Sequence, residues 1–387
     1  MTRKHAILSA SGAHRWLACT PSAQLEEQFS ESTSEYAEEG TFAHALADLQ
    51  LKYHLGQTTR SNYERQLKTL SKNEHYNPSM IDYIGNYVSV VAEKVNEASD
   101  RSKDVIVLLE QRLDFSAWVP EGFGTGDVVV ISDKVLEVID LKYGKGVAVS
   151  AKDNAQMRLY ALGALALFDS LYDIETVKMT ICQPRLDSVS TEEVTADFLL
   201  GWANAELKPR AEMAWNGEGE FRSGDHCRFC RARFNCRARA EANLELAKME
   251  FKKSDLLTDE EIGVVLTQAD ELTAWAVDVA KYALEQVRDH GKKYDGWKLV
   301  EGRSVRTYTD EDAVAAKLLK IGYKEEEIFQ KKVWGITAME KLLGKSKFAD
   351  FLKGLVVKPA GKPVLVPEAD KRPEISSTAG AVADFKN

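Results

Sequence analysis

The stretch from Val105 to Gln183 most constrains the fold, because short β-rich segments alternate there with one apolar helical segment. Three runs rich in β-branched residues predict strands: Val105–Leu113, Asp127–Ser132 and Val135–Leu141. The two-residue link Asp133-Lys134 predicts a tight hairpin between the last two. Asn154–Phe168 is apolar on most sides and predicts a buried helix, and Thr176–Gln183 predicts a further strand. We therefore expect an α/β core, with helices on the faces of a small mixed sheet.

Helical periodicity flanks this core. Apolar residues recur at three- and four-residue steps in Glu35–Leu55 and in Ser79–Ala98, which predicts two helices upstream. Downstream, we expect helix from Thr191 to about Trp215. Thr258–His290 opens with a capping sequence and predicts a long amphipathic helix that Gly291 stops.

The C-terminal part predicts smaller elements. A hairpin around Gly302 and helices over Thr309–Gly322 and Thr337–Gly354 are expected. Beyond Lys358 the chain carries four of its nine prolines, which predicts a disordered tail. We therefore divide the chain into residues 1–245, a mainly helical region of unknown role over 246–357, and a Pro-rich tail over 358–387.

Composition excludes several classes of protein. With 29% charged and 44% hydrophobic residues in 387, the chain is neither collagen-like nor globally disordered. A net charge of −9 argues against non-specific coating of nucleic acid or anionic membrane, but permits a local basic channel. No apolar run approaches the ~20 residues of a membrane span, and Met1–Leu17 holds no signal-peptide core. We expect a soluble, cytoplasmic protein.

Three of the five cysteines form the array Cys227-x2-Cys230-x5-Cys236. An odd count without a secretion signal indicates reduced thiols, and this spacing favours a metal centre over free buried thiols. Cys19 is the preferred fourth ligand, with His226 and Cys182 as alternatives, although Cys182 alternates with apolar residues in a predicted strand and fits the core better. Zinc and a [4Fe–4S] cluster both accept four cysteines, and the spacing does not separate them.

A second constellation consists of carboxylates and a lysine. Asp127 begins one predicted strand, and Asp140-Leu-Lys142 closes the next. Converging carboxylates suit Mg²⁺ or Mn²⁺, and a lysine two residues along the same strand emerges on the same face. Such a set can hydrolyse phosphodiesters, although a bare D-x-K pattern is more often the polar face of a strand end.

Three further polar residues gain meaning from their order along the chain. His44 lies on a predicted helix, and Gln156 and Tyr160 lie one turn apart on the helix after the D-x-K strand. Taken singly, each would more often be a structural residue. Glu110, in the middle of a predicted strand, could be an outer carboxylate or could face solvent.

The order His44, Gly124-Thr-Gly-Asp127, Asp140-Leu-Lys142, Gln156-x3-Tyr160 resembles the PD-(D/E)XK nuclease superfamily, in its RecB-type branch. One cysteine before these motifs and three after them resemble its iron–sulfur members, which include AddB-type subunits and CRISPR adaptation nucleases. The likeness spans about Leu8 to Arg239, and the N-terminal stretch is also similar to a phage and prophage family.

The resemblance implies a restriction-endonuclease-like core with an iron–sulfur-stapled helical extension, and a metal-dependent DNA exonuclease of phage recombination or replication in the bacterial cytoplasm. Asp127, Asp140 and His44 would bind Mg²⁺ or Mn²⁺, Lys142 would be the catalytic lysine, and Gln156 and Tyr160 would orient substrate. Cys19, Cys227, Cys230 and Cys236 would bind a [4Fe–4S] cluster. The alternatives are a non-catalytic DNA-binding or scaffold protein with the same fold, and a zinc-binding module without a nuclease site.

A basic segment indicates where DNA would bind. Between Arg222 and Arg239 there are six arginines and one acid, Asp225. These arginines could contact phosphates or pair with nearby acids, and three aromatic residues could stack on unpaired bases: Trp215, Phe229 and Phe234. The chain lacks a complete phosphate-binding loop, since Met339 stands where Leu343-Gly-Lys-Ser346 would need a glycine, so we expect no ATP hydrolysis. Replication or recombination proteins are expected partners.

Overall fold

The computed structural model describes residues 6–29, 34–247, 259–299, 310–321, 324–329, 336–353 and 355–356. The chain divides into two compact units, Met1–Glu285 and Gln286–Asn387. The candidate sites lie in the first unit. The hairpin expected around Gly302 and the Pro-rich tail lie largely or wholly outside the described residues.

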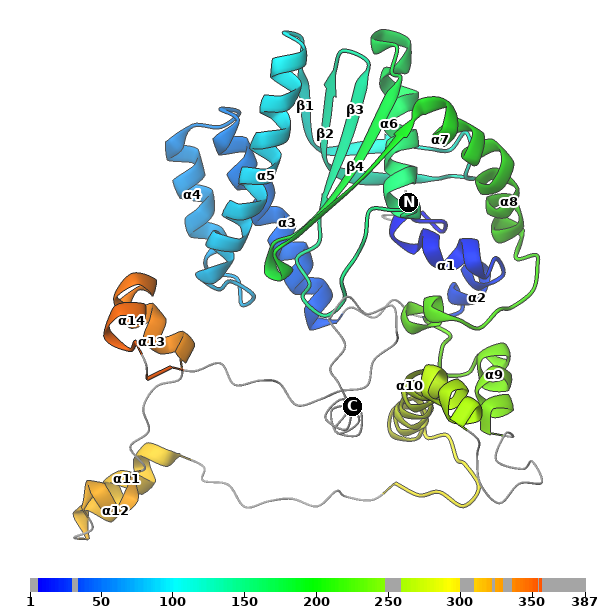
Figure 1. The fold of residues 1–387 in the computed structure, drawn as a ribbon. Coiled ribbons are helices and arrows are strands. Elements are labelled where there is room, and N and C mark those ends of the chain that lie inside the picture. The colour runs from blue at the N-terminus through cyan, green and yellow to red at the C-terminus, as the bar shows by residue number, and fades with distance from the viewer. Residues whose placement is uncertain are drawn as a thin grey trace, which may run out of the picture. The chain divides into compact units, whose positions relative to one another are not determined.

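A five-stranded open sheet forms the centre of the first unit (Figure 1). Its strands follow one another in chain order: β1 (Ile106–Asp114), β2 (Phe123–Ser132), β3 (Val135–Leu141), β4 (Thr176–Gln183) and β5 (Ser188–Thr195). β3 and β4 pair in parallel, and the other neighbours are antiparallel. The sheet is therefore mixed, as predicted.

Helices cover both faces of this sheet (Figure 1). On one face α3 (Glu35–His54) and α5 (Ser79–Arg101) bury apolar side chains against Val128, Val130 and Ile139, with α4 (Arg60–Leu70) packed on α3. On the other face α6 (Ala155–Tyr172) packs against β1, β2, β3 and β4. Its core includes Val129 and Val138, which alternate with the residues that face α3 and α5.

Short N-terminal helices extend the α6 side. The elements are η1 (Ala10–Gly12), α1 (Ala13–Ala18) and α2 (Ser22–Glu26), followed far along the chain by α7 (Ala196–Trp202), the π-helical turn η3 (Ala203–Leu207) and α8 (Lys208–Asn216). α8 packs on α1 and α2. Trp16 is buried in this layer and donates its indole N–H to the Ser9 carbonyl at 3.0 Å. The beginning of the chain is thus brought to the segment that follows the sheet.

The cysteine-rich segment contains η4 (Asp225–Phe229) and α9 (Arg237–Ala247), and α10 (Asp259–His290) follows. Arg239 is buried and is held by Glu271 at 2.6 Å and Asp278 at 2.7 Å, both on α10. Gly291, with φ of 64°, ends α10 in the left-handed conformation expected of a helix-terminating glycine. In the second unit the described helices are α11 (Glu311–Lys320), α12 (Glu325–Ile328), α13 (Ile336–Leu343) and α14 (Lys345–Phe351).

Two sequence predictions about the core were wrong. Thr191–Thr195 belongs to the edge strand β5, in which exposed residues alternate with half-buried ones and one face meets solvent. β2 begins at Phe123, so Asp127 lies inside the strand and not at its head. The other predicted strands and the helices α3, α5 and α6 are confirmed within a few residues.

Candidate metal and lysine site

The regular alternation of side chains between the two faces of the sheet is interrupted in β1 and β2 at Glu110 and Asp127. The register pairs Leu109 with Val128 and Gln111 with Gly126, which leaves Glu110 and Asp127 between those pairs. In a regular strand, Gly126 and Val128 would share one face of the sheet. Val128 packs toward α3 and α5, whereas a Cβ on Gly126 would lie 2.8 Å from Leu113, in the core on the α6 side. Glu110 has φ of 49°, a conformation that glutamate adopts rarely. Both side chains are thereby turned away from regular alternation, a distortion that is typical of functional positions.

His44, Glu110 and Asp127 place one ligand atom each within 4.8 Å of one another. The Nδ1 atom of His44 lies 3.0 Å from Oδ1 of Asp127. The other carboxylate oxygen of Asp127 accepts a hydrogen bond from the Leu141 N–H at 2.7 Å, which fixes its orientation. One imidazole nitrogen and two carboxylates form a donor set suited to a divalent cation such as Mn²⁺ or Mg²⁺.

Two of these three groups bind a proton more tightly than their free side chains do. Burial alone would lower the pKa of His44, but the charge and hydrogen bond of Asp127 outweigh it and raise the pKa to about 9. Burial, followed by the charge of Asp127, raises the pKa of Glu110 to about 7. A divalent cation bound here would therefore displace a proton from His44 and offset the charge of the two carboxylates.

Asp140, Lys142, Gln156 and Tyr160 form one hydrogen-bonded network on the α6 side. Lys142 Nζ lies 2.8 Å from Asp140 Oδ2 and donates to Gln156 Oε1 at 3.0 Å. The Gln156 amide donates in turn to Asp140 at 3.3 Å and to the Tyr160 hydroxyl at 3.2 Å. Burial raises the pKa of Asp140 despite the nearby ammonium. Gln156 thus fixes the direction of the Lys142 ammonium.

The two groups meet where Asp127, inside β2, lies opposite Asp140, near the end of β3. The register that pairs Val128 with Ile139 sets Asp127 opposite Asp140 when it is extended by one residue. The Asp127 carboxylate then contacts the backbone between Asp140 and Lys142 through Leu141. All six residues predicted from the sequence therefore lie close together. The predicted metal ligands differ in one member, because Glu110 joins His44 and Asp127 in the group of possible ligands. Asp140 instead contacts Lys142 and Gln156.

Tyr87 is a site residue that the sequence did not single out. This α5 side chain is fully buried and lines a pocket with His44, Glu110 and Asp127. Its hydroxyl has no hydrogen-bond partner among the described residues, and burial, then Asp127, raises its pKa well above the ordinary value. A tyrosine in the apolar stripe of a predicted helix carries no signal beyond core packing.

Cysteine pocket and the basic segment

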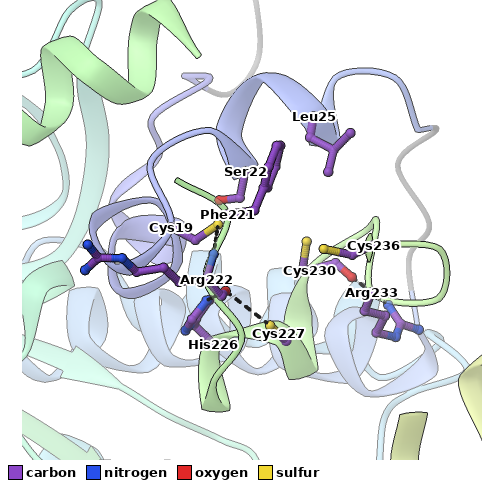
Figure 2. A pocket seen from close by; sticks show the side chains of 10 residues that line it. All are labelled: Cys19, Ser22, Leu25, Phe221, Arg222, His226, Cys227, Cys230, Arg233 and Cys236. Carbon is purple, nitrogen blue, oxygen red and sulfur yellow. Dashed lines mark hydrogen bonds between the residues drawn. The ribbon is translucent and has the colours of Figure 1, made fainter. Parts of the chain in front are cut away.

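Cys19, Cys227, Cys230 and Cys236 line one pocket, together with Phe221, Arg222, His226 and Arg233 (Figure 2). Cys19, Cys227 and Cys230 are buried, and burial raises the pKa of Cys230 to about 12. Of the predicted fourth ligands, Cys19 and His226 lie at this pocket. Cys182 does not, because it is buried in the core beneath α3 and α5, as expected for a structural thiol.

Backbone and imidazole groups already bind one of these sulfurs. The Arg222 N–H lies 3.5 Å from Cys19 Sγ (Figure 2). A hydrogen bond to Cys19 raises the pKa of His226. Such groups stabilise a thiolate. The four thiols line one pocket, so a metal bound there would join residue 19 to residues 227–236.

The spacing of the sulfurs bears on which centre fits. Tetrahedral zinc, with Zn–S bonds of about 2.3 Å, would bring its sulfurs to about 3.8 Å of one another. In the part of the chain that the structure describes, the group with three ligand atoms within 4.8 Å is His44, Glu110 and Asp127, and the cysteines form no such group. Among the described residues, no three cysteine sulfurs therefore lie within 4.8 Å of one another.

The arginines of the basic segment divide into two sets. Arg231 pairs with Glu26 and Glu27, and Arg233 and Arg239 pair with acids on α10. Arg222, Arg228 and Arg237 form no ion pair with a described residue, and all three are exposed. The charge available to a polyanion is therefore smaller than the composition of the segment predicts.

The three aromatic residues that could stack on bases differ in how far their rings are exposed. Phe234 stacks on Tyr282 at 4.2 Å between ring centroids and meets Phe29 edge-on, so its faces are covered. Trp215 packs against the α6-side core. Phe229 remains 57% exposed.

The fold and these sites define an α/β protein with a five-stranded mixed sheet, a candidate divalent-metal site and a four-cysteine pocket. Residues 5–373 match the family described as "Protein of unknown function (DUF2800)", and the chain belongs to that family. A solved structure titled "Crystal structure of SSO0001" is 20% identical, with 57% of this chain and 95% of that chain covered, at a TM-score of 0.24. A likeness this slight carries no argument. None of the helices among the described residues is long and apolar enough to cross a membrane.

Proposed function

We propose that this protein is a metal-dependent DNA nuclease with a PD-(D/E)XK core of the RecB type, acting as an exonuclease on DNA ends in phage recombination or replication. The observation that carries the proposal is the Lys142 ammonium, held between Asp140 at 2.8 Å and Gln156 at 3.0 Å beside the His44, Glu110 and Asp127 group. A fixed ammonium next to a divalent-metal site can offset the charge that builds up on the phosphoryl oxygens during phosphodiester hydrolysis.

Each residue has a role that follows from its contacts. His44, Glu110 and Asp127 would hold Mg²⁺ or Mn²⁺, which when bound polarises a phosphodiester and lowers the pKa of water. Lys142 offsets charge on the phosphoryl oxygens, and Asp140 and Gln156 keep its ammonium in place. The Tyr160 hydroxyl, which accepts a hydrogen bond from Gln156, can donate its own proton to a substrate oxygen.

The four-cysteine pocket supports a structural [4Fe–4S] cluster as part of the same proposal. Cys19 precedes the catalytic residues in the chain and the other three ligands follow them, so a cluster would tie the two ends of the nuclease domain together. Fixing two segments that are about 200 residues apart removes much of the conformational freedom of the unfolded chain.

The test is cleavage of end-labelled single- and double-stranded DNA by anaerobically purified protein with Mg²⁺ or Mn²⁺. Lys142→Ala is expected to lower the rate by about 10²- to 10³-fold. Lys145→Ala, on the exposed loop just after it, is the matched control and should leave the rate unchanged. DNA binding without cleavage by the wild type, at any metal concentration, would instead favour a non-catalytic DNA-binding protein that retains the fold.

A further inference from the structure

Phe229 presents a large apolar ring to solvent beside the cysteine pocket. The side chain is 57% exposed although its neighbours in the chain, Cys227 and Cys230, are buried in the cysteine pocket. Its backbone is fixed as well, because its carbonyl oxygen accepts a hydrogen bond from Arg15 Nη1 at 3.3 Å. The backbone that carries the exposed ring is therefore tied to Arg15 on α1.

Two polar groups flank the ring. The Arg228 guanidinium lies 5.5 Å from the ring centroid, and the His14 ring meets it edge-on at 6.3 Å and 80°. Arg228 is exposed and has no recorded ion pair with any described acid. Positive charge beside an exposed aromatic face is the combination with which proteins bind bases and phosphates of single strands.

A second exposed phenylalanine shows that this combination is not general on the surface. Phe198, on α7, is 53% exposed and has the Arg158 guanidinium 5.7 Å from its ring. Arg158, however, is neutralised by Asp153 at 2.7 Å and by Glu192 at 3.0 Å. The charge beside Phe229 is available to a ligand, whereas the charge beside Phe198 is not.

The Phe229 region is connected to the lysine site through the first helices of the chain. α1, which carries His14, packs against both η4 and α6. It follows directly on η1, where Ala10 is close to Gly124: a Cβ on Gly124 would lie 2.7 Å from the Tyr160 ring and 3.7 Å from Ala10 Cβ. Ala10, which lies beside Gly124 and Tyr160, is therefore only about one helical turn of chain away from His14.

We propose that Phe229, Arg228 and His14 form a stacking platform for an unpaired base of single-stranded DNA whose backbone continues to the site at Lys142. The proposal rests on the nuclease function and names its substrate as a DNA end with a single-stranded segment. A base pair inside a duplex offers no free face to Phe229, so the platform discriminates against blunt duplex.

The test uses the full-length protein and a fluorescein-labelled oligothymidylate, with anisotropy measured in EDTA so that no cleavage occurs. Phe229→Ala is expected to weaken binding by about 10- to 100-fold, Phe229→Trp to retain it, and Phe198→Ala, the matched control, to leave it unchanged. Binding of a blunt duplex of the same length should change less than threefold in all variants.

The platform is wrong if Phe229→Ala binds as the wild type does, or if Phe198→Ala or the duplex shows an equal loss. Because Phe229 lies between two cysteines, iron content and circular dichroism are measured for each variant. If Phe229→Ala loses iron, the Arg228→Gln variant tests the platform in its place. This variant should weaken oligothymidylate binding and reduce the dependence of the affinity on salt concentration by about one phosphate contact. An unchanged affinity would overturn the proposal.

Failure of the platform and failure of the nuclease give different results. Cleavage that depends on Lys142 with no effect of Phe229→Ala would remove the platform alone. Oligothymidylate binding that depends on Phe229 without cleavage by the wild type would remove the nuclease and leave a single-strand-binding protein.

Discussion

Glu110 on β1 and Asp127 on β2 lie opposite each other, between two regularly paired positions of these strands. Glu110 has a left-handed backbone there, with φ of 49°. The distortion directs both carboxylates toward His44 on α3 instead of into the regular alternation of the sheet. A left-handed glutamate costs of order 1–3 kcal/mol, which the surrounding sheet must offset. The strained backbone therefore belongs to a residue of the candidate metal-ligand group, Glu110.

Glu110→Gln should weaken Mn²⁺ binding by about tenfold or more, because outer contacts alone change metal affinity by 10- to 100-fold in comparable sites. Removing the charge leaves the size of the side chain almost unchanged, so the fold should persist. Titration calorimetry with Mn²⁺ measures the affinity. Glu64→Gln, an exposed glutamate on α4, is the control. An unchanged Mn²⁺ affinity in Glu110→Gln would restrict the metal ligands to His44 and the two aspartates.

Gly124→Ala should lower cleavage without unfolding the protein. A Cβ on Gly124 would lie 2.7 Å from the Tyr160 ring, which is 8% exposed and has little room to move. Overpacking of this kind costs about 1–3 kcal/mol, and here it would displace a hydroxyl that is bonded to Gln156. Gly144→Ala is the control, because its Cβ would have no neighbour within 4 Å. Equal rates for the two variants would contradict a role for the Tyr160 position.

Lys142→Ala and Gln156→Ala should not be additive. Gln156 acts by orienting the ammonium, so its removal should lower kcat by about 10- to 100-fold on its own and by little once Lys142 is absent. Single-turnover cleavage by the wild type, both single variants and the double variant gives the coupling. Multiplicative losses would show that Gln156 contacts substrate independently of Lys142.

The fold was predictable where local pattern and burial agree. β3 and β4 are nearly continuous apolar runs because helices cover both faces, and α6 is apolar on most sides because it lies against the sheet. β5 was not predicted, since its run of serine, threonine and glutamate places only alternate residues against the protein, which weakens the hydrophobic signal of an edge strand.

The site was predictable where chain order carried the information, and not where tertiary geometry did. His44, Asp127, Asp140, Lys142, Gln156 and Tyr160 were found by their order and do converge. The position of Glu110 depends on a backbone distortion, and that of Tyr87 on how α5 packs on the sheet. Neither distortion nor packing leaves a periodic trace in the sequence.

Cys230→Ser should abolish the iron and sulfide content and lower stability. We expect Tm to fall by roughly 6–12 °C, since each of about 3 kcal/mol lost lowers Tm by 2–4 °C in a domain of this size. Cys182→Ala is the matched control, because Cys182 is equally buried but lies in the sheet core. That variant should retain its iron while losing about 1 kcal/mol through a small cavity. Full iron content in Cys230→Ser, or stoichiometric zinc in the wild type, would contradict the cluster.

Glu137 should make stability fall as pH rises, because its pKa is higher in the folded protein than in the unfolded chain. The side chain is 1% exposed, burial raises its pKa above 4.5, and its Oε2 atom has no described hydrogen-bond partner. The folded state therefore keeps the proton to higher pH than the unfolded state does, so the stability present below pH 4.5 is lost as pH rises through the folded pKa.

Glu137→Gln removes this titration and keeps an oxygen that can accept the hydrogen bond from Thr180 Oγ1, at 2.9 Å in the wild type. The variant should gain stability relative to the wild type between pH 5 and pH 8, by about 1.4 kcal/mol for every tenfold difference in proton affinity between folded and unfolded states. Urea unfolding at both pH values measures the change. Glu193→Gln, an exposed residue on β5, should show no such gain. Parallel pH profiles for Glu137→Gln and the wild type would show that the buried carboxyl is already ionised in the folded protein at pH 5.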